Sequence, residues 1–178
     1  PRRRSPARWA ALPWGVRQAV SAVCLLGAPF ATAQAARGCD EWSGEVSAVE
    51  GRAEIRRANA ADWVVLNTGD RICFGDVVQV LSASRATITL PDRSTLGLDE
   101  ESTLNLREPP AGDGSLIELL RGIIHVISRD PRLLRFTTPY ANAGIEGTEF
   151  DIRVDDRERL TEVVVLEGEV VVTNAAGQ

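Results

Sequence analysis

The sequence predicts an all-β fold, an elongated and twisted stack of short strands that is either β-solenoid-like or a sandwich. From Trp42 onward, short segments that alternate apolar and polar residues follow one another about every eight to twelve residues or less, which is typical of all-β domains. Clusters of Gly, Pro, Asn, Asp and Ser separate these segments and favour turns. After residue 36 there is no strong helical pattern and no alternation of strands with helices. Glycines recur beside the segments, so each strand is expected to turn tightly into the next.

Each alternating segment predicts one strand. The first half of the domain is expected to form strands at 44–49, 53–57, 63–66, 77–81, 85–90, 95–98 and 103–106. A polar loop follows at 107–114. Residues 115–120 fit either a helical turn or a strand, since the spacing of their apolar residues does not distinguish the two. The second half is expected to form strands at 123–128, 133–137, 150–154, 161–166 and 169–173.

The apolar side of these alternations predicts the core. The residues expected inside are Ile55, Val78, Val80, Ile88, Leu90, Leu96, Leu98, Leu104, Ile124, Val126, Phe136, Phe150, Ile152, Val164 and Leu166. The run from Val163 to Leu166 is continuously apolar, which predicts a strand buried on both faces in the middle of a sheet or stack.

Residues 1–36 have the composition of a signal peptide. Five arginines and no acidic residue accompany a short apolar stretch at 19–30, and small residues follow with the spacing that a signal peptidase needs. A membrane anchor is the alternative, but this stretch is shorter than the roughly 20 apolar residues that span a bilayer. We therefore expect a periplasmic or secreted protein, or alternatively an inner-membrane protein that faces the periplasm.

The expected organisation is a signal peptide at 1–36, a leading segment at 37–43, a β domain at 44–173 and a turn at 174–178 that leads into a further C-terminal part. Residues 37–178 carry 15 arginines against 25 acidic side chains, a net charge of −10. A surface this acidic argues against nucleic acid and anionic lipid as partners, because both require a positive face.

Cys39 and Cys73 remain as a pair once residues 1–36 are removed, and an exported protein enters an oxidising compartment. A disulfide between them would close a loop of about 35 residues and stabilise the fold by roughly 4 kcal/mol. Two free buried thiols or a partial metal site are the alternatives. With two cysteines and one histidine, a tetrahedral zinc site lacks ligands unless carboxylates join, so no metal and no cofactor are expected.

The segment 138–152 combines turn and strand chemistry. Pro139 has a fixed φ and pushes Thr138 into the extended region, while Gly144 and Gly147 allow backbone angles or close approaches that a side chain would block. From Glu149 to Val154 charged residues alternate with apolar ones, as they do in a half-buried strand. The chain is therefore expected to bend twice within this segment.

The Thr138-Pro139 step and the Gly147-Thr148-Glu149-Phe150 box resemble the signature of the FecR domain, in which a Thr-Pro step enters a short strand and the box opens the next one. The resemblance extends over 46–172. In the turn after Pro91-Asp92, Arg93 replaces the usual glycine of the family, and we expect a φ below zero there. Cys39 and Cys73-Phe74-Gly75-Asp76 are similar to an exported subgroup that continues into tetratricopeptide repeats.

This resemblance implies a protein partner in the cell envelope. The predicted function is an exported, non-catalytic FecR-like domain that serves as a protein-interaction or signalling module in the periplasm. It would dock its partner at an exposed strand edge or through its acidic face. The alternative is a carbohydrate or cell-wall binding module, which could bind a glycan or peptidoglycan by stacking on Trp63 and Tyr140.

Catalytic groups are scarce, and no catalytic residue is expected. His125 is the single histidine, shares a strand face with Ile123 and Ile127, and is accompanied by no nucleophile motif. Glu146 and Glu149 are expected to hydrogen-bond the local backbone rather than to form a glycosidase pair. The acidic turns at 99–101 and 155–156 lack calcium-loop spacing and are expected to be solvated.

Overall fold

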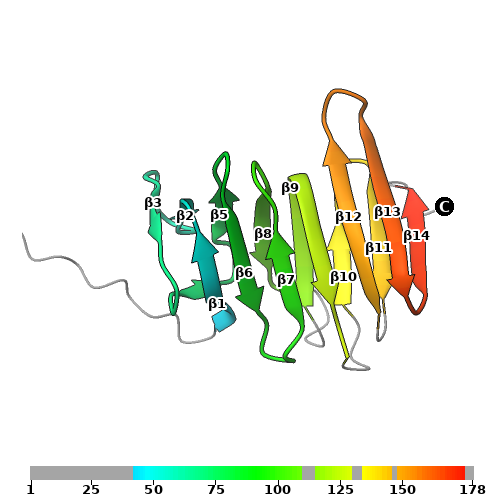
Figure 1. The fold of residues 1–178 in the computed structure, drawn as a ribbon, viewed down its shortest axis with the longest axis horizontal. Coiled ribbons are helices and arrows are strands. Elements are labelled where there is room, and N and C mark those ends of the chain that lie inside the picture. Colours follow the sequence, from blue (N-terminus) through cyan, green and yellow to red (C-terminus); the bar gives the residue numbers. More distant parts are fainter. Residues whose placement is uncertain (1–41, 110–114, 130–133, 146–147, 175–178) are drawn as a thin grey trace, which may run out of the picture. The chain divides into compact units, whose positions relative to one another are not determined.

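The computed structural model describes residues 42–109, 115–129, 134–145 and 148–174. These residues belong to the second of two compact units, 36–178. They form fourteen strands and no helix, which confirms the predicted all-β class (Figure 1). The predicted signal peptide and the C-terminal turn after 174 lie outside the described residues.

One layer of the fold, sheet A, contains strands from both halves of the chain. Its order is β4 (Arg71–Cys73), β1 (Trp42–Glu50), β6 (Arg85–Thr89), β7 (Thr95–Leu98), the second half of β9 (Ser115–Ile127), β12 (Glu149–Asp155) and β13 (Leu160–Glu167). All of these neighbours run antiparallel.

The second layer, sheet B, is arranged in the same manner. Its order is β3 (Val64–Leu66), β2 (Ala53–Arg56), β5 (Val77–Val80), β8 (Thr103–Arg107), the first half of β9, β10 (Leu134–Thr137), β11 (Ala141–Ile145) and β14 (Val170–Asn174). Only β9 and β10 run parallel among the described strands. A regular coil would stack parallel strands, so the antiparallel pairing favours the sandwich over the solenoid.

Strand β9 joins the two layers. Residues 115–121 pair with β8 and β10, whereas 122–127 pair with β12 and β7. Gly122 lies between the two halves of β9 and has a φ of +91°. A Cβ added to Gly122 would lie 2.4 Å from the Cα of Ser102. The Ser102 hydroxyl donates to the carbonyl of Ile123 and accepts from its amide. Residues 115–120, left open between helix and strand, are therefore strand, continuous with the segment expected at 123–128.

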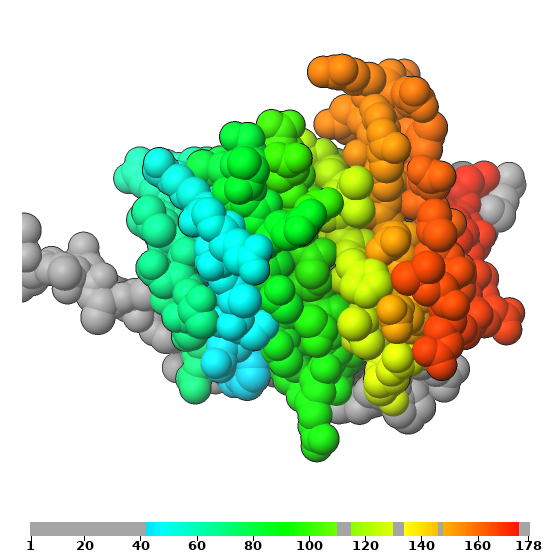
Figure 2. Space-filling view, in the orientation of Figure 1, coloured from blue at the N-terminus to red at the C-terminus, as the bar shows by residue number. Residues whose placement is uncertain are grey.

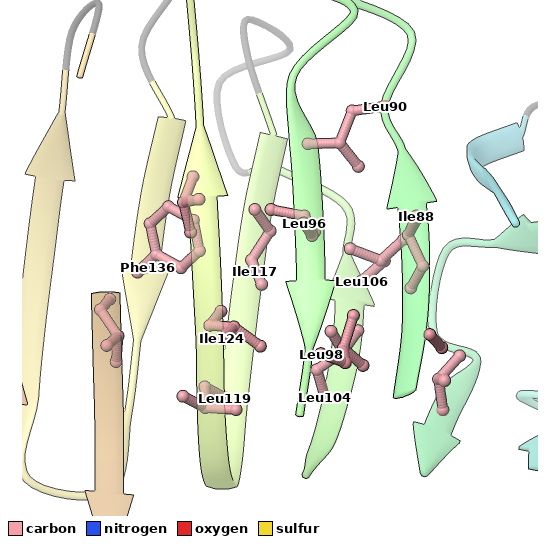
Figure 3. Packing of buried hydrophobic residues seen from close by; sticks show 14 of the residues in the cluster. Ile88, Leu90, Leu96, Leu98, Leu104, Leu106, Ile117, Leu119, Ile124 and Phe136 are labelled. Atoms are coloured by element: carbon pink, nitrogen blue, oxygen red, sulfur yellow. The ribbon is translucent and has the colours of Figure 1, made fainter. Parts of the chain in front are cut away.

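The inward faces of both sheets form one hydrophobic core (Figure 3). Ile88, Leu96 and Ile124 come from sheet A, and Leu106 and Ile117 come from sheet B. Phe136 of sheet B meets Phe150 of sheet A edge to face, with ring centroids 5.4 Å apart. Thirteen of the residues predicted inside are fully buried: Ile55, Val78, Val80, Ile88, Leu90, Leu96, Leu98, Leu104, Ile124, Val126, Phe136, Phe150 and Ile152.

The prediction for the valine run was wrong. Val164 and Leu166 retain 46% and 57% of their accessible surface, because β13 is an edge strand that pairs only with β12 among the described strands. Val163 packs against the core, while Val164 lies opposite Asp151 on the outer face. A run of β-branched residues indicates strand propensity, but it does not determine whether the strand is central or at an edge.

Two further local expectations need correction. Strands β4 and β11 were not predicted as separate segments, since β4 has only three residues and β11 only five, and both lie among turn residues.

The backbone of Arg93 was expected to have a φ below zero, but its φ is +68°. Its amide donates to the carbonyl of Leu90, and the Asp92 carboxylate accepts from the Ser94 amide, so the turn keeps a left-handed residue although it is not glycine.

Asp76 is a buried carboxylate with a complete set of partners. Its oxygens accept from the guanidinium of Arg57 at 2.7 Å, from the amide of Ala58 at 3.0 Å and from the amide of Cys73 at 2.9 Å. These contacts tie the end of β2 to the turn between β4 and β5. A buried charge is tolerated when it is paired and hydrogen-bonded in this way.

We predict that Gly122→Ala lowers the free energy of unfolding by about 2–5 kcal/mol, since it adds a left-handed backbone penalty to a collision with the Ser102 backbone. Gly69→Ala is the matched control, because Gly69 has a similar φ of +88° but nothing within 4 Å of an added Cβ. That variant should lose only about 1–2 kcal/mol. Urea unfolding of both variants would contradict the prediction if the two losses were equal.

Candidate functional site

The Thr138-Pro139 step forms the turn between β10 and β11. The Thr138 hydroxyl accepts from the amides of Tyr140 and Ala141 at 3.2 and 2.9 Å. It also lies 2.6 Å from the hydroxyl of Thr161 on β13, in the opposite sheet. Thr138 therefore organises the turn and connects it to the other layer, which is a structural role for this signature residue.

The second half of the signature begins β12, and Gly147 lies outside the described residues. Thr148 is fully buried, and its carbonyl accepts from the amide of Ser128 at 2.9 Å. Its hydroxyl has no hydrogen-bond partner in the part of the chain that the structure describes. Phe150 supplies the aromatic contact with Phe136 across the core.

Glu149 belongs to a cluster of charged side chains on the outer face of sheet A. Arg129 donates to Glu149 at 3.2 Å and to Glu167 at 2.8 Å, and so bridges β12 and β13. His125 Nδ1 lies 2.7 Å from Asp151 Oδ1, and its Nε2 lies 3.6 Å from Glu149 Oε1. We call these five residues the His125 cluster. Glu149 uses its carboxylate for side-chain ion pairs, whereas a backbone role was expected.

The cluster exists because two strands pair in a particular register. Asp151 on β12 lies directly opposite His125 on β9, and Glu149 lies opposite Ile127. His125 and Asp151 are 26 positions apart in sequence, and Ile127 and Glu149 are 22 apart, so alternation alone could not place them together. The carboxylate of Glu167, and to a smaller extent that of Glu149, holds the pKa of Arg129 above its ordinary value.

Beside the cluster is an open hollow of about 330 Å³ on the outer face of sheet A. Gly97, Thr87, Ile123, His125 and Asp151 contribute to its lining. An imidazole with a carboxylate can activate a nucleophile, but the described lining offers no serine or cysteine, and its Thr87 hydroxyl makes no hydrogen bond to His125. Within the described residues no group of three or more His, Cys, Asp or Glu could hold a metal ion. The geometry fits an electrostatic connection between strands.

The two aromatic residues predicted to stack on sugars lie apart. Trp63 immediately precedes β3 and is 37% exposed, with the Arg56 guanidinium 5.3 Å from its ring centroid. Tyr140 lies next to β11 and packs partly buried against the core. Six strand spacings separate β3 from β11 in sheet B, or roughly 29 Å. Trp63 and Tyr140 therefore do not form one platform.

The carboxylates of the acidic turns accept from nearby amides or pair with an arginine. The amides of Glu158 and Arg157 donate to Asp155 and hold the pKa of its carboxyl below the ordinary value. Asp99 pairs with Arg85 at 2.8 Å, and Glu100 accepts from the amide of Ala83.

The fold and these contacts define an all-β module whose signature residues serve packing and turn formation. The model of the FecR family, described as FecR protein, matches residues 76–171, which is more than half of the chain. The chain therefore belongs to the FecR family. The match is narrower than the resemblance over 46–172 that the motifs indicated.

Solved structures resemble this fold. Two crystal structures, at 2.50 and 1.65 Å, show a "putative anti-sigma factor" from Parabacteroides distasonis ATCC 8503. Each has a TM-score of 0.50 and 22% sequence identity, and the match covers 56% of this chain and 47% of that one. This chain thus corresponds to about half of the solved relative. A search of the curated proteins found no match.

The described residues contain no helix that is long and apolar enough to cross a membrane.

We predict that Thr138→Val lowers the free energy of unfolding by about 1–3 kcal/mol, because two amides of the turn and the Thr161 hydroxyl lose their partner. Thr138→Ser keeps the hydroxyl and should lose less than about 1 kcal/mol. Thermal and urea unfolding of the two variants provide the comparison. A loss in Thr138→Ser as large as that in Thr138→Val would contradict the prediction, because the methyl group would then contribute as much as the hydroxyl.

Proposed function

We propose that this protein is a non-catalytic signalling or regulatory module of the cell envelope that acts by binding a protein partner. The observation that carries the proposal is membership in the FecR family over 76–171. The fold similarity to a structure described as a "putative anti-sigma factor" agrees with it.

The proposed location is the periplasm or the secreted fraction. Its support is the signal-peptide composition of 1–36. An inner-membrane anchor that leaves the β domain in the periplasm remains the alternative, and a continuation into tetratricopeptide repeats stays a prediction.

The proposed disulfide joins Cys39 and Cys73. Cys73 ends β4 directly opposite Trp42, the first residue of β1. Cys39 lies outside the described residues, only three positions before Trp42. Three residues span at most about 10 Å, so Cys39 is within reach of Cys73. The bond would hold the leading segment 37–43 against the edge of sheet A.

We predict that peptide mapping of the protein from its native host, without reduction, recovers a Cys39–Cys73 linked pair. Cys39→Ser and Cys73→Ser should then lower the free energy of unfolding by similar amounts, about 2–4 kcal/mol, since each removes the same bond. Full alkylation of both thiols in unreduced material would contradict the pairing.

Glycan or peptidoglycan binding is the second candidate function. Its one supporting feature is the exposed indole of Trp63. The distance between Trp63 and Tyr140 weighs against it, because sugar stacking gains from aromatic groups on one surface. Retention on peptidoglycan that disappears in a folded Trp63→Ala variant would favour this candidate over protein binding.

We predict that deletion of the gene in its native host changes the transcription of a limited gene set, and that the full chain expressed in trans restores it. The Gly122→Ala variant is the control for loss of fold, and should fail to restore the transcripts. Fractionation of the same cells should recover the protein in the periplasm. Unchanged transcripts in the deletion strain, under all growth conditions tested, would overturn the regulatory proposal.

A further inference from the structure

The outer face of sheet B carries arginines, although residues 37–178 are acidic overall. They include Arg56, Arg107, Arg121 and Arg135. Three of these have partners, because Arg56 stacks on Trp63, Arg107 pairs with Glu118 and Arg121 donates to Thr103. Arg135 is partly buried and makes no hydrogen bond and no ion pair with any described residue. Its guanidinium is therefore available to a ligand.

Arg135 lies beside a gap in this face. Its neighbours across the sheet are Leu116 on β9 and Gly144 on β11, and Gly144 in turn lies opposite Val171 on β14. Over the glycine is an open hollow of about 310 Å³. Strand β14, red in Figure 2, forms one wall of the hollow. The lining also includes polar side chains of the next row across the sheet, Thr137, Asn142 and Thr173.

The backbone angle does not explain this glycine. Gly144 lies within β11, and its φ is not positive. Glycine inside a strand weakens the strand, and it often marks a place where a ligand approaches the backbone closely. Two roles were expected for Gly144, an unusual backbone angle or a close approach. Its ordinary φ leaves the close approach.

The lining indicates the chemistry of the ligand. Arg135 is the one charged side chain among the described residues of the lining, so a ligand with a single negative charge would balance it. A phosphate group carries nearly two charges at neutral pH and would lack a second cation here. The Thr137 hydroxyl bonds to no described residue and can donate to the same anion. Leu116 and Val171 provide apolar walls.

We propose that this hollow is a binding site for a small carboxylic acid with a short aliphatic part. Arg135 would bind the carboxylate, and the aliphatic part would lie over Gly144 between Leu116 and Val171. A hollow that is mostly apolar and holds a few convergent polar groups is typical of small-molecule sites, and its volume is at the lower end of their range. This inference goes beyond the proposed function, because its ligand is not a protein.

A second copy of the chain fits this face poorly. A two-fold interface brings the same surface of both copies together, so the arginines of the two copies would meet. Like charges that face each other in this way oppose association. A segment of this or another protein that inserts an acidic side chain is the remaining alternative, and a peptide probe separates it from a free acid.

The test uses the full chain, labelled for amide NMR spectra, and isocaproate as the probe. The acid should cause saturable shifts of the amide signals at 135–144 and 171–173, because these residues surround the hollow. Isocaproamide has the same shape without the charge, and inorganic phosphate has charge without the aliphatic part. Each should bind at least tenfold more weakly than the acid. Equal binding of either compound, or no saturable shift at the hollow, would overturn the proposal.

Two pairs of variants locate the site. Gly144→Val fills the hollow and should weaken isocaproate binding at least tenfold. Gly97→Val makes the same change on the outer face of sheet A, where an added Cβ meets nothing closer than 3.7 Å, and should change binding less than twofold. Arg135→Gln should also weaken binding at least tenfold, with Arg121→Gln as the control for one charge lost from the same face. Equal effects within either pair, in variants with wild-type melting curves, would exclude the hollow.

The source of the carboxylate is tested with a blocked tripeptide in which glutamate lies between two leucines. It should bind the hollow no more tightly than isocaproate does. Tenfold tighter binding of the tripeptide, or shifts at the hollow that vary with protein concentration before any acid is added, would contradict a small molecule as the occupant. These titrations use the purified chain, so they can succeed when the deletion strain shows no change in transcripts, and they can fail when it does.

Discussion

The crossing of β9 between the two layers is the constraint on which the rest of the structure depends. One strand pairs with β8 and β10 before Gly122, and with β7 and β12 after it. Only a residue without a side chain can lie this close to Ser102 with a φ of +91°. The Ser102 hydroxyl satisfies both the amide and the carbonyl of Ile123 at the bend. Strand β9 therefore belongs to both sheets, and their inward faces pack into one core.

The residues that carry the family signature contribute mainly to this architecture. Thr138 holds the turn before β11 and reaches Thr161 in the other sheet, and Phe150 packs on Phe136 across the core. Such residues stabilise a fold without setting what it binds. Strand pairing places the charged side chains on the outer face of sheet A, and the signature residue Glu149 is one of them.

Two features of the outer face of sheet A follow from the same strand pairing. The ladder between β9 and β12 brings His125 to Asp151, and the ladder between β12 and β13 brings Glu162 beside Arg153. Arg129 then spans Glu149 and Glu167 and holds the end of β13 to β12. Exposed ion pairs of this kind contribute little stability each, but they define the position of charge on a surface. Charge placed in this way is suited to selecting a partner.

The sequence alone determined the strand content, most strand positions and about half of the core, thirteen of the 25 core residues that the structure describes, because alternation with a period of two specifies which residues share a face. It also identified the family through local motifs such as Thr138-Pro139 and Thr148-Glu149-Phe150. Tertiary structure decided what local patterns do not contain: that 115–127 is one strand shared by two sheets, that the valine run of β13 lies at an edge, and that His125 meets Asp151. These features depend on which strands become neighbours, and neighbours in a sheet are set by long-range packing rather than by the residues beside them in the chain.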